Sequence, residues 1–321
     1  MYFYLKLIMG DKMVFVYIED YSFLTKIIYY LDMASINYTT DLDSDFSYIL
    51  FAEVNMKTLK MMDEYPDKKF IFITHIEENK IFHHFTSNNK RSTTIKNKYH
   101  SIFKRCYKLI VSLPYFKNLF LNDCHFIDVI PKTLPIINIS RSTKDIYEKY
   151  ELKKRRKKIV IMDINYDYIS YLHDLSYRYP KFDFIYIGYK SKYLLTKKEK
   201  SLISDMNINV KYIPYVDLNI FSDLCKVSYM VIDFNSYILD RNYLYMILLL
   251  KKQLMLYENV LYDDFLIPSK HAYFFKDKDE LFLRFDKIIQ TRVMNLSENG
   301  FDLIKGFSTF DIVKKYSETL Q

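Results

Sequence analysis

Glycine is scarce in this chain of 321 residues, which contains only four, at Gly10, Gly188, Gly300 and Gly306. Loops that cradle phosphate groups depend on glycine, because they need positive φ angles and close approach of the backbone. Neither a G-x-G-x-x-G fingerprint nor a P-loop can be formed from these positions. The sequence therefore argues against a glycine-rich dinucleotide or nucleoside triphosphate site.

Cysteine is also rare, and Cys106, Cys124 and Cys225 are scattered without a C-x-x-C pair. An odd number of separated cysteines provides no disulfide framework, which suits a reducing compartment. The adjacent His83 and His84 point in different directions, and no set of cysteines or carboxylates completes a metal site around them. We therefore expect a cytoplasmic protein with no metal and no bound cofactor.

Long apolar runs are missing as well. The longest candidate, Tyr243–Leu250, falls short of the roughly 18 residues that a transmembrane helix needs. The apolar start, Met1–Met9, has no basic region before it and no cleavage site of the signal-peptide type. We expect neither a transmembrane helix nor a signal peptide. Either Met1 or Met13 is expected to be the initiator methionine.

Positive charge is in excess, with a formal net charge of +8, and much of it lies in one segment. That segment contains Lys153, Lys154, Arg155, Arg156, Lys157 and Lys158. Two explanations stay open: a solvated linker, or an exposed basic patch that attaches the protein to an anionic membrane surface. No nucleic-acid-binding motif accompanies the patch, so nucleic acid is not an expected partner.

Strand-like apolar runs alternate with segments of helical spacing, stop at the basic segment and start again after it. Strands separated by helices form parallel sheets with right-handed crossovers. We therefore predict an α/β protein of two doubly wound, Rossmann-like domains, 1–145 and 146–321, which face a cleft. The boundary is expected within Thr143–Lys157, and the C-terminal helices are expected to close the second domain. Ligands of such sheets bind at the carboxyl ends of the strands.

The predicted strands are short and mostly apolar. In the first domain they include Met13–Ile18, Phe46–Phe51, Lys69–Thr74 and Lys108–Ser112, and in the second Lys158–Asp163, Phe182–Gly188, Tyr229–Asp233 and Gln253–Tyr257. The polar stretch Ser87–Lys98 is expected to precede a short helix near Tyr99–Arg105.

His75 is the leading catalytic candidate, because it follows the carboxyl end of a predicted buried strand and has Glu77 and Glu78 beside it. An ordinary loop histidine is the open alternative. Asp263 and Asp264 stand at the predicted start of a helix. They serve either as N-terminal capping residues or as residues of the cleft.

Short segments along most of the chain carry a resemblance to a known family. They are Tyr179–Gly188, Asn207–Ile213, Leu224–Ile232 and Tyr262–Phe265 in the second half, with Ile73–Glu78 and Leu109–Phe116 in the first. In order and spacing they resemble retaining glycosyltransferases of the GT-B fold, family 4. Within that family, they are most similar to bacterial diacylglycerol glucosyl- and galactosyltransferases.

The resemblance implies an acceptor-side first domain, with Glu77 and Glu78, and a donor-side second domain. The implied donor-side residues are Gly188, Leu239, Ile247, Asp263 and Asp264. Leu239 and Ile247 stand where the family has two glutamates that face the donor sugar and the ribose. Asp240, one residue out of register, is the other catalytic candidate. No Lys or Arg occurs between Ile159 and Tyr177, where the family places cations against the diphosphate.

Two functions therefore stay open. In the first, a peripheral protein at the inner face of the membrane transfers a sugar from a nucleotide sugar to a membrane lipid or cell-envelope glycan. In the second, a catalytically inactive GT-B homologue, a pseudoenzyme, acts as partner or binding module for an active glycosyltransferase. The missing glutamates and cations predict weak or absent binding of nucleotide sugars.

Overall fold

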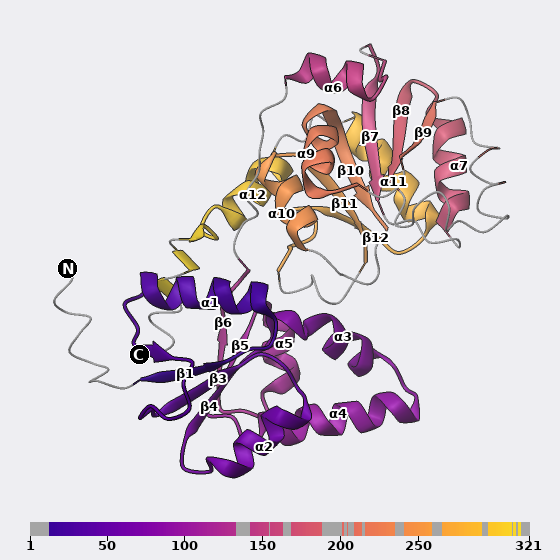
Figure 1. The fold of residues 1–321 in the computed structure, drawn as a ribbon. Helices are drawn as coiled ribbons and strands as arrows, with labels where there is room; N and C mark the ends of the chain where they lie inside the picture. The colour runs from indigo at the N-terminus through magenta and orange to yellow at the C-terminus, as the bar shows by residue number, and fades with distance from the viewer. Residues whose placement is uncertain are drawn as a thin grey trace. The chain divides into compact units, whose positions relative to one another are not determined.

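The chain forms two compact units, each a parallel sheet with helices (Figure 1). The computed structural model describes residues 13–132, 142–153, 155–162, 168–187, 201, 204, 209–213, 216–234, 241–258, 265–290, 295–309, 311–312 and 314–315. One unit comprises Met1–Thr133 with Phe307–Gln321, and the other comprises Leu134–Gly306.

The first unit is built on a six-stranded sheet in the order β2-β1-β3-β4-β5-β6, with parallel pairings. Its strands are β1 (Val14–Tyr17), β2 (Tyr38–Thr39), β3 (Tyr48–Phe51), β4 (Lys69–Ile73), β5 (Lys108–Val111) and β6 (Phe126–Val129). Its helices are α1 (Tyr21–Met33), α2 (Met56–Glu64), the 3-10 helix η2 (Thr74–Ile76), α3 (Glu78–Thr86), α4 (Lys90–Phe103) and α5 (Pro114–Phe120). The order of the strands places β1 beside β3, so the loops that follow these two strands are neighbours.

Apolar side chains cover both faces of this sheet. On one face, Val14 of β1 packs in a cluster with Ile27 of α1. Ile312, near the C-terminus, belongs to the same cluster and so packs with the first unit, although it was predicted to lie in the second domain. Elsewhere in the sheet Phe72 of β4 contacts Phe103 of α4, with ring centroids 5.1 Å apart.

The second unit is built on another six-stranded sheet, in the order β12-β11-β10-β7-β8-β9, again with parallel pairings. Its strands are β7 (Lys157–Met162), β8 (Phe182–Ile187), β9 (Val210–Ile213), β10 (Ser228–Asp233), β11 (Gln253–Tyr257) and β12 (Tyr273–Phe275). Numbered within the unit, this is the 3-2-1-4-5-6 order of doubly wound nucleotide-binding folds, with the reversal between β7 and β10.

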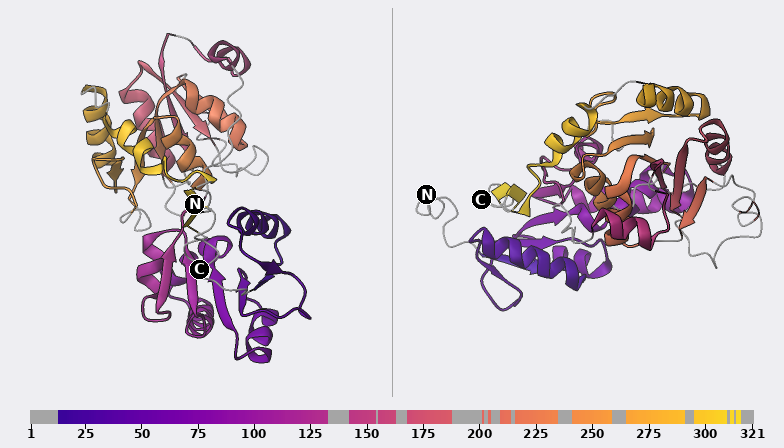
Figure 2. Two further views of the ribbon diagram at one scale, coloured as in Figure 1. Left: turned by 90° about the vertical axis from the view of Figure 1, so that its left-hand side faces the viewer. Right: turned by 90° about the horizontal axis from the view of Figure 1, so that it is seen from above.

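The helices of the second unit are α6 (Thr143–Lys149), α7 (Ile169–Arg178), α9 (Leu218–Val227), α10 (Arg241–Leu249), α11 (Lys278–Gln290) and α12 (Asn295–Ile304). Leu172 of α7 and Phe285 of α11 pack in one cluster with Ile161 of β7. Helix α12 lies close to α10, because a Cβ atom at Gly300 would stand 2.8 Å from Cδ2 of Leu248. Figure 2 shows the strands and helices of each unit from two further directions.

The α/β fold with two Rossmann-like sheets confirms the predicted fold class. Two helices differ from the expectation. Most of the polar stretch Ser87–Lys98 belongs to α4, which begins after the N-cap Asn89. Helix α6 lies inside the expected boundary segment and starts with a capping box between Ser142 and Asp145.

Candidate functional site

The loops after β1 and β3 meet where the strand order of the first sheet reverses. Open α/β sheets bind ligands at the carboxyl ends of the strands beside such a reversal. The loop after β1 carries Glu19 and Asp20, and the loop after β3 carries Glu53 and Asn55. The fold therefore places three carboxylates and an amide at the position where a ligand is expected.

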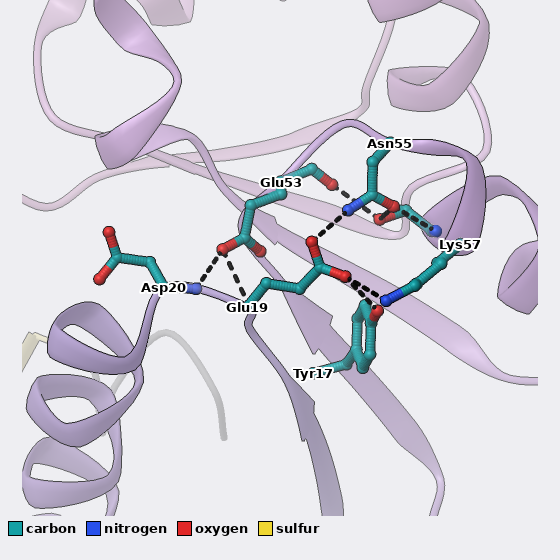
Figure 3. A network of polar contacts seen from close by, with 7 residues as sticks. Tyr17, Glu19, Asp20, Glu53, Asn55 and Lys57 are labelled. Atoms are coloured by element: carbon teal, nitrogen blue, oxygen red, sulfur yellow. Dashed lines mark hydrogen bonds and ion pairs between the residues drawn. The ribbon is translucent and has the colours of Figure 1, made fainter.

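Glu53 joins the two loops. Its Oε1 accepts hydrogen bonds from the backbone N–H groups of Glu19, at 3.0 Å, and Asp20, at 2.9 Å (Figure 3). Its other oxygen, Oε2, is buried and has no hydrogen-bond partner among the described residues. Burial raises the pKa of Glu53, and the charges of Glu19 and Glu77 raise it further, although the two backbone N–H groups oppose the shift.

Glu19 accepts hydrogen bonds from three side chains. Tyr17 at the end of β1 donates to Oε1 at 2.9 Å, Lys57 of α2 donates to the same oxygen at 2.9 Å, and Asn55 donates to Oε2 at 3.1 Å (Figure 3). The hydrogen bonds from Lys57 and Tyr17 lower the pKa of Glu19. Glu19 therefore stays ionised near neutral pH, and its partly exposed carboxylate is held in one orientation.

His75 and Glu77 lie next along the same edge, after β4. His75 belongs to η2 and is 7% exposed, and its ring packs edge-on against Phe23 of α1 at 6.2 Å. Glu77, also buried, accepts a hydrogen bond from Tyr99 at 2.6 Å and one from Lys80 at 3.0 Å. Burial, and then the hydrogen bond to Glu77, raises the pKa of Tyr99, which therefore remains a neutral donor.

Glu78 ties the carboxyl ends of β4 and β5 together. It is 2% exposed and accepts hydrogen bonds from the Ser112 N–H at 2.7 Å, the Ser112 hydroxyl at 2.5 Å and the Thr74 hydroxyl at 3.0 Å. Lys132, which follows β6, lies 3.9 Å from its Oε2. This network fixes the geometry of the edge.

The edge as a whole suits a ligand with hydroxyl groups. Carboxylates and amides offer strong acceptors for hydroxyl donors. A carboxyl group whose pKa is raised toward neutrality is also a suitable proton acceptor for general base catalysis. Glu53 combines a raised pKa with an oxygen, Oε2, that makes no hydrogen bond to any described residue.

The donor-side residues of the second unit are placed only in part. Ile247 is 1% exposed within α10, so no charged group occupies that position and the side chain belongs to the core. Gly188, Leu239, Asp240, Asp263 and Asp264 lie outside the described residues.

The basic segment Lys153–Lys158 does not form a continuous exposed patch, because some of its side chains are buried or paired. Lys153, Arg155 and Lys157 are exposed. Arg156 contacts Asp183 at 3.3 Å, whereas Lys158 is fully buried and donates hydrogen bonds to the backbone carbonyls of Lys153 and Arg156. The expectation of Lys158 in an exposed patch is therefore corrected, because its ammonium group satisfies buried carbonyls. Lys154 lies outside the described residues.

His75, Glu77 and Glu78 were predicted from the sequence as site residues, whereas Glu19 and Glu53 were not. All five follow a strand at its carboxyl end, and that signal was present in the sequence for each of them. The order of the strands in the sheet had no such signal in the sequence. Only this order makes the loops after β1 and β3 neighbours.

Along the described ranges, no cluster of His, Cys, Asp or Glu is arranged to hold a metal ion. Over the same ranges, no helix has both the length and the apolar character needed to cross a bilayer.

Comparison with known proteins supports the fold. No protein-family model matches the chain, and no curated protein sequence matches it. Among solved structures, HepE from Anabaena in complex with UDP superposes with a TM-score of 0.69 at 11% identity, covering 96% of this chain and 99% of that one. A glycosyltransferase from Rickettsia africae gives a TM-score of 0.65 at 13% identity, with 97% and 99% coverage.

A third similar structure, sucrose-phosphate synthase from Thermosynechococcus elongatus, gives a TM-score of 0.61 at 12% identity, covering 85% of this chain and 72% of that one. Identities this low establish shared architecture and nothing finer. The chain has the GT-B fold of glycosyltransferases, with two Rossmann-like domains.

Proposed function

We propose that this protein is a glycosyltransferase that uses a nucleotide sugar as donor. The observation that carries the proposal is likeness over nearly the whole length of both chains to HepE, whose structures contain UDP and UDP-glucose. The second unit also has the strand order of nucleotide-binding sheets. We place the donor there, at the carboxyl ends of β7 and β10.

Donor binding is expected to be weak. Ile247 is buried at the position where the family that this chain resembles has a glutamate. No Lys or Arg occurs between Ile159 and Tyr177, where that family places cations against the diphosphate. A ribose hydroxyl left without an acceptor costs about 1–3 kcal/mol. The affinity is therefore expected near the upper end of ordinary KM values, about 0.1–1 mM.

The acceptor is proposed to bind at the edge of the first sheet. Glu19 and Asn55 can hydrogen-bond to acceptor hydroxyl groups, and Glu53 can take up the proton of the hydroxyl that attacks the sugar. Following the resemblance to diacylglycerol glycosyltransferases, we propose a membrane lipid or a cell-envelope glycan as acceptor, modified at the membrane surface.

A second candidate function rests on the same buried Ile247. A GT-B homologue without a donor-site carboxylate is suited to serve as a non-catalytic partner of an active glycosyltransferase. This candidate requires that no nucleotide sugar binds and that an active enzyme co-purifies with the protein.

The test is release of nucleoside diphosphate from a panel of UDP- and GDP-sugars, with lipid vesicles and envelope glycans as acceptors. One donor and acceptor pair is expected to give release, and Glu53→Gln is expected to lower kcat by about 100-fold or more. Glu64→Gln, at an exposed position of α2, is the matched control and should leave kcat unchanged. Absence of release with every pair, together with recovery of an active glycosyltransferase in a pull-down, would favour the second candidate.

A further inference from the structure

A long stretch of the first unit carries no acidic residue. No Asp or Glu occurs from Asn79 to Asn122, a segment that builds most of α3 together with α4, β5 and α5. The basic residues of α4, of its C-terminal end and of α5 are Lys90, Arg91, Lys96, Lys98, Lys104 and Lys117. None of these forms an ion pair with a described residue. We refer to them together as the α4 face.

Helix α4 is amphipathic and presents this charge outward. Tyr99, Ile102 and Phe103 are buried, and α4 packs against α3, with the two helices side by side in Figure 1. Lys90, Arg91, Lys104 and Lys117 are exposed, and Lys96 and Lys98 are half-buried. The helix has 14 residues and spans about 21 Å, so its cations line an extended surface.

The acidic side chains near this surface already have other side-chain partners. Asp63 of α2 binds Arg105 at 2.8 Å. Asp123 is 5% exposed and contacts His100 of α4 at 2.5 Å. Glu77 binds Lys80. The α4 face therefore keeps its positive charge available for a partner outside the chain.

Exposed apolar side chains border the same elements. Leu121, directly after α5, is 55% exposed, and Phe126 at the start of β6 is 54% exposed. Phe126 contacts Tyr107, three residues after Lys104, with ring centroids 5.3 Å apart. Cations and exposed apolar side chains on the same unit suit a membrane interface, which combines anionic headgroups with an apolar layer.

We propose that the α4 face docks the protein on an anionic lipid surface. The segment Lys153–Lys158 is less suited to this role, because Lys158 is buried, Arg156 contacts Asp183, and Lys157 lies 4.1 Å from the ring of Tyr229. Docking through α4 goes beyond glycosyl transfer and does not depend on donor binding, so each can fail without the other.

The test is sedimentation of the full-length protein with phosphatidylcholine vesicles and with vesicles that also contain phosphatidylglycerol. Binding is expected only to the anionic vesicles, and raising the salt from about 0.1 M to 1 M should abolish it, because screening shortens from about 10 Å to 3 Å. Each lysine near the surface contributes about a fivefold change in affinity. The double variant Lys98→Gln with Lys104→Gln should therefore bind at least tenfold more weakly.

The matched control removes the same charge from the second unit, through Lys153→Gln with Lys157→Gln, and should bind within twofold of the unaltered protein. Circular dichroism and thermal unfolding of both variants should match the parent, so that any loss of binding reports the surface. If both double variants weakened vesicle binding equally, the binding would depend on net charge and not on the α4 face, and the proposal would be overturned. Equal binding to neutral vesicles, or tighter binding to duplex DNA than to anionic vesicles, would overturn it as well.

Discussion

Replacement of Glu78 by alanine gives the sharpest test of how the edge of the first sheet is held. Glu78 is 2% exposed and accepts hydrogen bonds from the N–H and hydroxyl groups of Ser112 and from the hydroxyl of Thr74. In Glu78→Ala the Thr74 hydroxyl can still donate to the Ile110 carbonyl, 3.3 Å away. The two Ser112 donors lose the carboxylate, and each buried donor without an acceptor costs about 1–3 kcal/mol.

The expected loss in the free energy of unfolding is therefore about 3–5 kcal/mol, in the range found when one member of a buried charged network is removed. Glu78→Gln keeps an acceptor for the Ser112 N–H, so it should cost about 1–2 kcal/mol. Glu64→Ala, which removes a surface pair with Lys60, is the control and should cost less than about 0.5 kcal/mol. Urea denaturation at pH 7 measures all three, and a loss below about 1 kcal/mol for Glu78→Ala would refute the reasoning.

Three further substitutions are informative. Because the pKa of Glu53 is raised on folding, its contribution to stability is fully present below the unfolded value of about 4.3 and is lost as the pH rises through the folded value. Glu53→Gln should therefore be at least as stable as the parent at pH 7 by urea denaturation; a clear loss there would speak against a raised pKa. Ile247→Glu buries an unpaired charge, so it should lower the free energy of unfolding by several kcal/mol in the same assay and should not improve donor binding. Tighter donor binding by this variant would mean that position 247 lines the donor site. Tyr99→Phe removes a 2.6 Å hydrogen bond to buried Glu77 and should cost about 1–3 kcal/mol; unchanged stability would contradict this.

Strands were the elements best predicted from the sequence. Gln253–Tyr257 matches β11 at both ends, and the predictions for β4 and β5 each extend one residue beyond the observed strand. Central parallel strands are buried on both faces, so they appear as short runs of apolar residues whatever their neighbours are.

Helix α4 was predicted only at its C-terminal end. Three of its four apolar positions, Tyr99, Ile102 and Phe103, lie in the second half, and its first turn is polar and basic. A polar stretch of this kind is read as a loop until its packing partners are known. The N-cap Asn89, which accepts a hydrogen bond from Ser92, was the local signal for its start.

Only part of the candidate site could be predicted from the sequence. His75, Glu77 and Glu78 follow one strand in sequence, so a strand prediction alone locates them. Glu19 and Glu53 are 34 residues apart and come together only because β3 pairs with β1 rather than with β2. The pairing of strands that are distant in sequence depends on the whole fold, and so does the packing of Ile312 on the first sheet. Neither can be recognised from the neighbouring residues in the sequence.

The most direct test of the central claim is a calorimetric titration of the protein with UDP- and GDP-sugars. The account predicts saturable binding of at least one nucleotide sugar with a dissociation constant of about 0.1–1 mM, competed by the matching nucleoside diphosphate. Absence of saturable binding of every nucleotide sugar at concentrations well above about 1 mM would contradict the proposed glycosyltransferase activity.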